Sequence, residues 1–274
     1  LASKASGYPI ARVSAKIAVG MTLDEIMIAN TPASFEPTLD YVVTKMPRFP
    51  FDKFTQASNK LSTQMKATGE VMAIGRTMEE SLLKATRSLE IGVCHIYMSK
   101  FDKSKMSVDL MKYIEEGTDD RIYAIAQLMY LGVDHSRICN VTQIDMFFLD
   151  KIKNIVDFEK VLEQPESVGN IDLLYKAKKM GFCDKYIAHL WQMTEDDVFE
   201  MRKKHNMFPV YKMIDTCASE FDSYIPYFYS TYEEENESIV SDKAKIIVLG
   251  SGPIRIGQGV EFDYSTVHAV KTIK

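Results

Sequence analysis

The sequence has no long uncharged apolar run. No stretch reaches the roughly 18 consecutive apolar residues that a membrane-spanning helix needs, so we expect no membrane partner. It also lacks a basic N-terminal segment followed by an apolar one, which argues against a secretory signal and favours a cytoplasmic protein. A formal net charge of -5 argues against a nucleic-acid partner, because phosphates require a basic surface.

Cysteine is also rare. The four cysteines, Cys94, Cys139, Cys183 and Cys217, form no CxxC pair, and no histidine follows them at zinc-finger spacing. We therefore predict reduced, mostly buried thiols and no metal site. With 274 residues and a hydrophobic content of 46%, the chain is long enough for a core that needs no disulfide or metal.

Residues 1–76 mix helical and extended signals. Residues 10–19 have a helix-like pattern, and Thr22 to Glu25 has the spacing of a capping box. The apolar runs at 41–44 and 71–74 are predicted to be strands, the first because prolines restrict the backbone on both sides of it.

From residue 77 the apolar period is that of helices. Capping signals at Thr77, Thr118, Thr142 and Thr194 each precede a helical pattern, and Gly132 and Gly181 mark two helix ends. The predicted helices after residue 118 cover 119–131, 146–162, 171–180 and 195–204, with Phe148, Ile152, Ile155 and Leu162 on one face.

The pattern changes again near the end of the chain. Residues 233–242 are acidic and polar, as in a linker, and 244–249 are predicted to be a buried strand. A glycine-rich turn at 250–259 and a helix from 262 complete a βα unit, which must belong to a larger α/β domain because it cannot cover both faces of its strand. The chain begins without Met and ends at Lys274 inside this helix, so we expect both ends to be cuts.

The glycine-rich turn fits neither common nucleotide motif. A dinucleotide fingerprint requires glycine where Arg255 stands, and a Walker A loop requires Lys and a hydroxyl residue where Gln258 and Gly259 stand. The alternative is that the glycines allow tight packing of strand and helix without a ligand. The weak candidates for cofactor binding are Gly250, Gly252 and Gly257.

Residues 250–264, GSGPIRIGQGVEFDY, resemble the turn that opens each half of the carbamoyl phosphate synthetase large subunit. Further segments resemble the same family in the same order along the chain. They are 1–10, 31–37, 63–66 with 69–76, and 210–218 with 229–234. The chain differs from that family in one place: the loop near Asn30 is shorter than the loop that relatives have there.

The resemblance implies an α+β, mostly α-helical fragment with three parts. Residues 1–76 would be the C-terminal part of the first ATP-grasp (carboxyphosphate) module, 77–242 the helical oligomerisation domain, and 243–274 the start of a Rossmann-like pre-ATP-grasp domain. The residues that hold metal and phosphates in the family's first active site would lie upstream of Leu1. We therefore expect no catalytic residue in this chain and an inactive fragment.

The parent implied by the resemblance is an ATP-dependent ligase of arginine and pyrimidine biosynthesis. It would use ATP with Mg or Mn, bicarbonate, and ammonia from a glutaminase small subunit, with the rest of the large subunit and a second copy of the chain as partners. The resemblance places five residues at the internal tunnel between the two active sites: Met65, Glu70, Arg255, Gly259 and Glu261. Glu70 as a salt-bridged carboxylate, and Arg255 paired with Glu261, are the structural alternatives.

Two other functions stay open from the sequence. One is a free-standing helical interaction protein, and the other is a nucleotide-binding α/β enzyme that uses residues 250–259. Cys94 and His95 place a thiol beside an imidazole, but adjacent side chains seldom face each other, so we expect no catalytic pair there.

Overall fold

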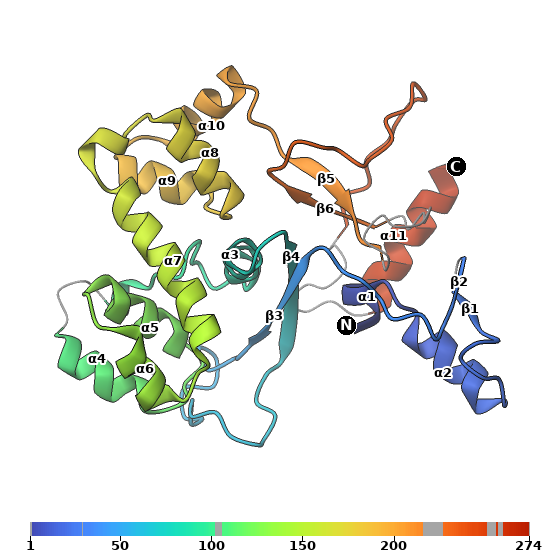
Figure 1. The fold of residues 1–274 in the computed structure, drawn as a ribbon, viewed down its shortest axis with the longest axis horizontal. Coiled ribbons are helices and arrows are strands. Elements are labelled where there is room, and N and C mark those ends of the chain that lie inside the picture. The colour runs from blue at the N-terminus through green and yellow to red at the C-terminus, as the bar shows by residue number, and fades with distance from the viewer. Residues whose placement is uncertain are drawn as a thin grey trace.

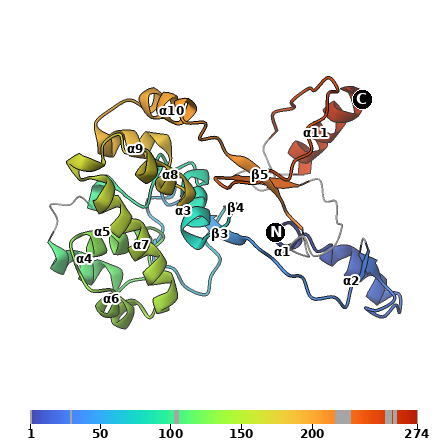
Figure 2. The ribbon, with the colours of Figure 1, turned by 45° about the horizontal axis from the view of Figure 1, so that its top comes forward.

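The structure is a computed structural model that describes residues 2–28, 30–101, 106–215, 227–250, 256 and 260–273, with the backbone alone for residues 4 and 260–263. A helical body stands on one side of a narrow strand region, and the N-terminal elements and the last helix lie on the other (Figures 1 and 2). The fold is α+β and mostly helical, as predicted.

The N-terminal elements form a small unit of their own. Helices α1 (Ala2–Ser6) and α2 (Ile10–Ala18) precede a short hairpin of β1 (Met27–Ile28) and β2 (Thr31–Pro32). The helix predicted at 10–19 is confirmed. The Glu25 carboxylate accepts a hydrogen bond from the Thr22 N–H at 2.9 Å, but residues 22–25 form turns and open no helix.

Two long strands form the central ribbon. β3 (Val42–Arg48) pairs antiparallel with β4 (Gly69–Gly75), with Val42 opposite Gly75. Successive residues of β4 point to opposite sides, and both sides are covered. Met72 and Ile74 pack with Tyr41, Ile214 and Tyr229. Val71 and Ala73 pack with Ala85, Leu89 and the partly buried Ile256. The two strands predicted in this region are therefore confirmed.

The helical body surrounds the longest helix, α7. Its helices are α3 (Met78–Ser88), α4 (Ser107–Ile114), α5 (Arg121–Tyr130), α6 (His135–Thr142), α7 (Met146–Leu162), α8 (Ile171–Lys179), α9 (Asp184–Trp191) and α10 (Glu195–Lys204), with 3-10 turns η1 (Ser99–Phe101) and η2 (Pro165–Ser167). Ile152, Ile155 and Leu162 of α7 are buried on one face. Phe148 lies on the same face, as predicted, but is 47% exposed. Phe148 and Ile155 are seven residues apart and therefore lie on the same side of α7. Phe148 is exposed because it lies in the first turn, where no other described element covers this side of the helix.

The predicted caps have mixed outcomes. Thr77 accepts from the Glu80 N–H, and Thr194 and Asp197 form a complete capping box. The prediction for Thr118 is wrong, because its hydroxyl donates to the Asp120 carboxylate and α5 begins only at Arg121.

The cap predicted at Thr142 is also wrong. Thr142 is the last residue of α6, and its hydroxyl donates to the Ile138 carbonyl at 2.8 Å. Asp145 caps α7 instead, since its carboxylate accepts from the Phe147 N–H. The helix ends at Gly132 and Gly181 are as predicted, and both glycines have positive φ, at 84° and 92°.

The last described segments return to the strand region. β5 (Val210–Met213) pairs antiparallel with β6 (Phe228–Thr231), and α11 (Val260–Ile273) is the predicted final helix. The strand predicted at 244–249 is wrong for the described structure. Ile246, Ile247 and Leu249 are 68%, 82% and 93% exposed. A buried strand needs neighbours that satisfy its backbone and cover its faces, and no described strand pairs with this segment.

Candidate functional site

The residues predicted to border a tunnel have different environments. Met65 is 91% exposed. Glu70 lies at the start of β4, and its carboxylate forms an ion pair with Lys45 of β3 at 2.6 Å. Arg255 and Gly259 lie outside the described residues, and Glu261 belongs to α11 with only its backbone described. In this structure Glu70 is therefore a salt-bridged carboxylate, which was the structural alternative to the tunnel role.

One residue of the glycine-rich turn reaches the central ribbon. Ile256 packs against the cluster that contains Val71 and Ala73 of β4. The structure therefore places Ile256 on the face of β4 opposite to Glu70. Among the three weak cofactor candidates, Gly252 and Gly257 lie outside the described residues.

The third candidate, Gly250, lies against α11. A Cβ atom added there would stand 3.0 Å from the Thr266 hydroxyl oxygen, closer than most side-chain contacts allow. This proximity accounts for the glycine through packing of the chain against the helix, without a ligand.

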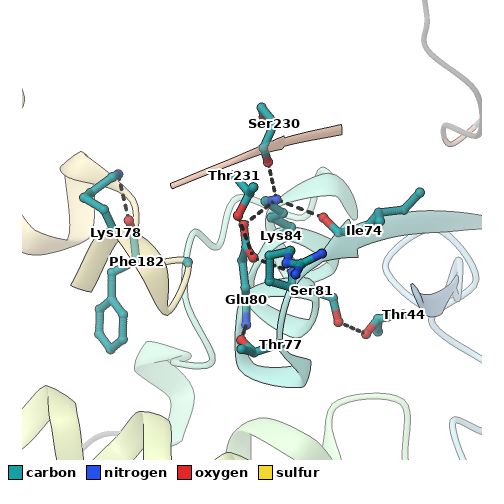
Figure 3. A network of polar contacts seen from close by, with 12 residues as sticks. Thr44, Ile74, Thr77, Glu80, Ser81, Lys84, Lys178, Phe182, Ser230 and Thr231 are labelled. Atoms are coloured by element: carbon teal, nitrogen blue, oxygen red, sulfur yellow. Dashed lines mark hydrogen bonds and ion pairs between the residues drawn. The ribbon is translucent and has the colours of Figure 1, made fainter. Parts of the chain in front are cut away.

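The most elaborate polar site in the described structure is centred on Glu80 of α3 (Figure 3). The Glu80 carboxylate is only 1% exposed, and it accepts hydrogen bonds from the Arg76 N–H at 2.7 Å and the Thr231 hydroxyl at 3.1 Å. Its other oxygen forms an ion pair with Lys84 at 2.7 Å. A carboxylate taken out of water needs such partners on both oxygens, and the three bonds come from the end of β4, from β6 and from α3 itself.

Lys84 extends this site to two backbone carbonyls. Its ammonium donates to the carbonyl oxygens of Ile74 at 2.8 Å and Ser230 at 2.6 Å. Burial lowers the pKa of Lys84, and the Glu80 carboxylate opposes that shift. We call Glu80, Lys84 and their partners Arg76, Thr231, Ile74 and Ser230 the Glu80 junction. It fixes α3 to β4 and β6 at the same point.

Two glycines make room for the junction. A Cβ atom on Gly75 would lie 2.8 Å from the Glu80 carboxylate, and one on Gly181 would lie 2.8 Å from the Glu80 Cα. Gly181 follows α8, so the loop between α8 and α9 lies directly on α3. Arg87 also binds this loop, donating to the Gly181 carbonyl at 2.7 Å. The junction therefore joins strands, α3 and the second half of the helical body.

A second ion cluster ties β6 to α8, α9 and α10. Asp184 binds Lys178 at 2.8 Å and Arg202 at 2.5 Å. Arg202 also donates to the Tyr232 hydroxyl oxygen at 3.0 Å, directly after β6. Burial opposes ionisation of Asp184, but the two cations outweigh it and hold the pKa of the carboxyl below its usual value.

The Cys94 and His95 side chains make separate contacts. The His95 ring stacks on Tyr186 with centroids 3.9 Å apart, and its Nε2 lies 3.5 Å from a Glu159 oxygen. Burial lowers the pKa of His95, so the imidazole is neutral near pH 7. Cys94 instead lies near Cys183. Cys94, Cys139 and Cys183 are free thiols, as predicted, but the prediction that they are mostly buried is wrong, because all three are only partly buried at the edge of the main core. Cys217 lies outside the described residues.

The chemistry of these groups is structural. Both oxygens of Glu80 and of Asp184 are bonded to protein groups, so neither carboxylate presents a free oxygen to a substrate. Within the described ranges, no three His, Cys, Asp or Glu side chains are grouped so as to hold a metal ion. None of the described helices is long and apolar enough to cross a membrane.

The sequence alone did not identify the Glu80 junction. The Thr77 to Glu80 spacing predicted a capping box, in which Glu80 would bind the Thr77 N–H, but the carboxylate binds the preceding N–H, of Arg76. The spacing of Glu80 and Lys84 is that of a helical ion pair, which was a usable signal. Nothing in the spacing of Asp184 and Arg202, or of Glu80 and Thr231, indicates that they meet.

Comparison with protein families agrees with the resemblance found in the sequence. Residues 70–206, half of the chain, match the family described as carbamoyl-phosphate synthetase large chain, oligomerisation domain. Residues 242–274 match the family described as carbamoyl phosphate synthase preATP-grasp domain. The first match begins in β4 and ends after α10, so it contains Glu80, Lys84, Asp184 and Arg202. The chain therefore belongs to the carbamoyl phosphate synthetase large-chain family.

Proposed function

We propose that this chain is a scaffold segment of a glutamine-dependent carbamoyl phosphate synthetase, and that it holds the two synthetase halves in a fixed relation. The Glu80 junction carries the proposal. It binds α3, the first helix of the helical body, to β4 before that body in the chain and to β6 after it. A buried ion pair with four further protein partners resists relative motion of these elements.

The parent's activity follows from the family. It is an ATP-dependent ligase that makes carbamoyl phosphate from bicarbonate, glutamine-derived ammonia and two ATP. In that parent, Mg or Mn would neutralise the transferred phosphates, and a glutaminase small subunit would supply ammonia. The chain itself contributes no catalytic residue and binds no cofactor in this proposal, and its place would be in the cytoplasm.

The proposed tunnel role rests on one packing contact. Ile256, in the middle of the glycine-rich turn, packs against Val71 and Ala73 of β4, the strand that carries Glu70 on its opposite face. In the proposal, Met65 and Glu70 on one side and Arg255, Gly259 and Glu261 on the other border the passage for carbamate. Carbamate hydrolyses in water, so a rigid boundary at this seam would exclude solvent.

The test of the scaffold role is the coupling of the two active sites in the complete synthetase. Glu80→Gln would loosen the junction, and we expect carbamate to be lost, so that more than two ATP are consumed for each carbamoyl phosphate formed. The matched control is Glu200→Gln in the middle of α10, where the exposed carboxylate pairs only with Lys203 in the described structure. Equal ATP consumption per product in both variants would refute the scaffold role.

The oligomerisation-domain match supports self-association, and light scattering of the 274-residue chain measures it. We expect a mass above that of one chain, which rises with concentration. Calorimetric titration with magnesium ATP and with NAD tests the other function, a nucleotide-binding enzyme. Micromolar binding of either nucleotide would favour an enzyme that uses residues 250–259, whereas no binding tighter than millimolar agrees with the scaffold.

A further inference from the structure

Two cysteines far apart in the sequence lie together in the structure. Cys94 follows α3, and Cys183 is the N-terminal cap residue of α9. The Cys183 thiol donates to the Cys94 carbonyl oxygen at 3.7 Å, so the two cysteines lie directly beside each other. Both residues are half-buried. Their thiols are therefore close enough to react without long-range rearrangement of the chain.

The surroundings of Cys183 favour a thiolate. Arg87 and Lys178 reach the same loop, donating to the carbonyls of Gly181 at 2.7 Å and Phe182 at 2.8 Å. The interaction with the Cys94 side chain lowers the pKa of Cys183 to about 6, although burial opposes this shift. Both the N-terminal end of α9 and the two cations stabilise a negative sulfur.

Cys94 has the opposite character. Its hydrogen bond to Cys183 and its burial raise the pKa of Cys94 above the ordinary thiol value, so it stays protonated near pH 7. The neighbouring Asp184 would disfavour a thiolate, but Lys178 and Arg202 bind both of its oxygens. One sulfur is therefore ready to attack, and the other holds a proton.

The pair has a route to solvent. Cys94 lines an open cavity of about 490 Å³ together with Tyr97, Lys185 and His189. Lys185 and His189 belong to α9, the helix that Cys183 caps. Cys183 itself does not line this cavity, but its sulfur lies beside Cys94, so a small neutral oxidant that enters the cavity reaches the residue next to the attacking sulfur without unfolding of the helical body.

We propose that Cys94 and Cys183 form a redox modification site, in which a hydroperoxide converts the two thiols to an intramolecular disulfide. The Cys183 thiolate attacks one peroxide oxygen, the O–O bond breaks, and the released hydroxide takes a proton to become water. The Cys94 sulfur then attacks the sulfenic acid on Cys183, the S–O bond breaks, and hydroxide leaves with the Cys94 proton as water. Two thiols lose two electrons, and one hydrogen peroxide gives two water molecules.

The disulfide would join the segment after α3 to the start of α9 across 89 residues of chain. Closing a loop of this length restricts the unfolded state strongly. We expect the midpoint of thermal unfolding to rise by roughly 5–10 °C on oxidation and to return on treatment with dithiothreitol.

The experiment treats the 274-residue chain with hydrogen peroxide at pH 7, blocks remaining thiols with iodoacetamide, and maps proteolytic peptides by mass spectrometry. The expected product is a peptide pair linked through Cys94 and Cys183. Cys94→Ser should leave a sulfenic acid on Cys183 that dimedone traps, and Cys183→Ser should abolish the reaction at this pair. Cys139→Ser on α6 is the matched control and should oxidise like the unaltered chain.

A measurement on the unaltered chain keeps the test independent of how the variants fold. Alkylation of Cys183 should follow a titration with a midpoint near pH 6, at least tenfold faster at pH 7 than that of Cys139. The proposal is overturned if Cys139 and Cys183 react at the same rate, or if peroxide links either member of the pair mainly to Cys217 or to another chain.

Discussion

Glu80→Gln is the sharpest perturbation of the junction. The substitution keeps the shape of the side chain and removes its charge, which leaves the Lys84 ammonium, 22% exposed, without its carboxylate. Removing one member of a buried ion pair costs about 3–5 kcal/mol. Lys84 retains the carbonyls of Ile74 and Ser230 and some water, so we expect a smaller loss, of about 2–3 kcal/mol.

The assay is urea and thermal unfolding of the 274-residue chain at pH 7, followed by circular dichroism at 222 nm. The expected loss corresponds to a midpoint about 5–10 °C lower. Glu200→Gln, whose carboxylate side chain is 63% exposed, should change the free energy of unfolding by less than about 0.5 kcal/mol.

A double-mutant cycle isolates the interaction itself. Lys84→Met removes the buried cation, so Glu80→Gln combined with Lys84→Met should be more stable than the sum of the two single losses predicts, by about 1–2 kcal/mol. If Glu80→Gln unfolds within about 0.5 kcal/mol of the unaltered chain, or if the two losses are additive, the junction does not hold these elements together and the reasoning fails.

Three further predictions use the same unfolding assay. Gly181→Ala should cost about 3–4 kcal/mol, because the residue has a φ of 92° and its Cβ would strike the Glu80 backbone, whereas Gly169→Ala, with a φ of 74° and open space, should cost about 1 kcal/mol. Asp184→Asn should lower the free energy of unfolding by about 3 kcal/mol at pH 7. It should also weaken the loss of stability in acid. The pKa of Asp184 is lowered in the folded chain, so the carboxylate stabilises the fold above about pH 4 and this stabilisation is lost as the pH falls further. His95→Phe should flatten the loss of stability below about pH 6.5, because burial lowers the folded pKa of this imidazole and the unfolded chain takes up the proton first.

Each of these predictions has a clear contrary result. Equal losses for the two glycine variants would mean that positive φ, and not the contact with α3, sets the cost. An unchanged acid limb in Asp184→Asn, measured from pH 5 down to pH 2.5, would show that this carboxyl does not drive acid unfolding. His95→Phe should be compared with His205→Phe, whose residue lies just after α10. If the stability of both variants changes with pH in the same way, burial of His95 is not the cause of the pH dependence.

The sequence determined the local structure wherever one segment carries the whole signal. The helix pattern at 10–19, the strands at 41–44 and 71–74 and the Thr194 to Asp197 box were readable because their periodicity and caps lie within a few residues. The family resemblance was equally local, since it rests on contiguous segments such as 250–264. The wrong cap at Thr142 has a local cause too, because Asp145 is an equally good acceptor and the spacing does not choose between them.

Tertiary structure decided what depends on partners far away in the chain. The apolar run at 244–249 has the composition of a buried strand, but a strand forms only where others pair with it, and no described strand does. Glu80 and Thr231, or Cys94 and Cys183, meet only after α3 packs against β4 and the loop before α9. The sequence thus specified several of the elements and the family, while the buried ion pairs and the thiol pair arose from packing, because burial and long-range proximity do not exist in a sequence pattern.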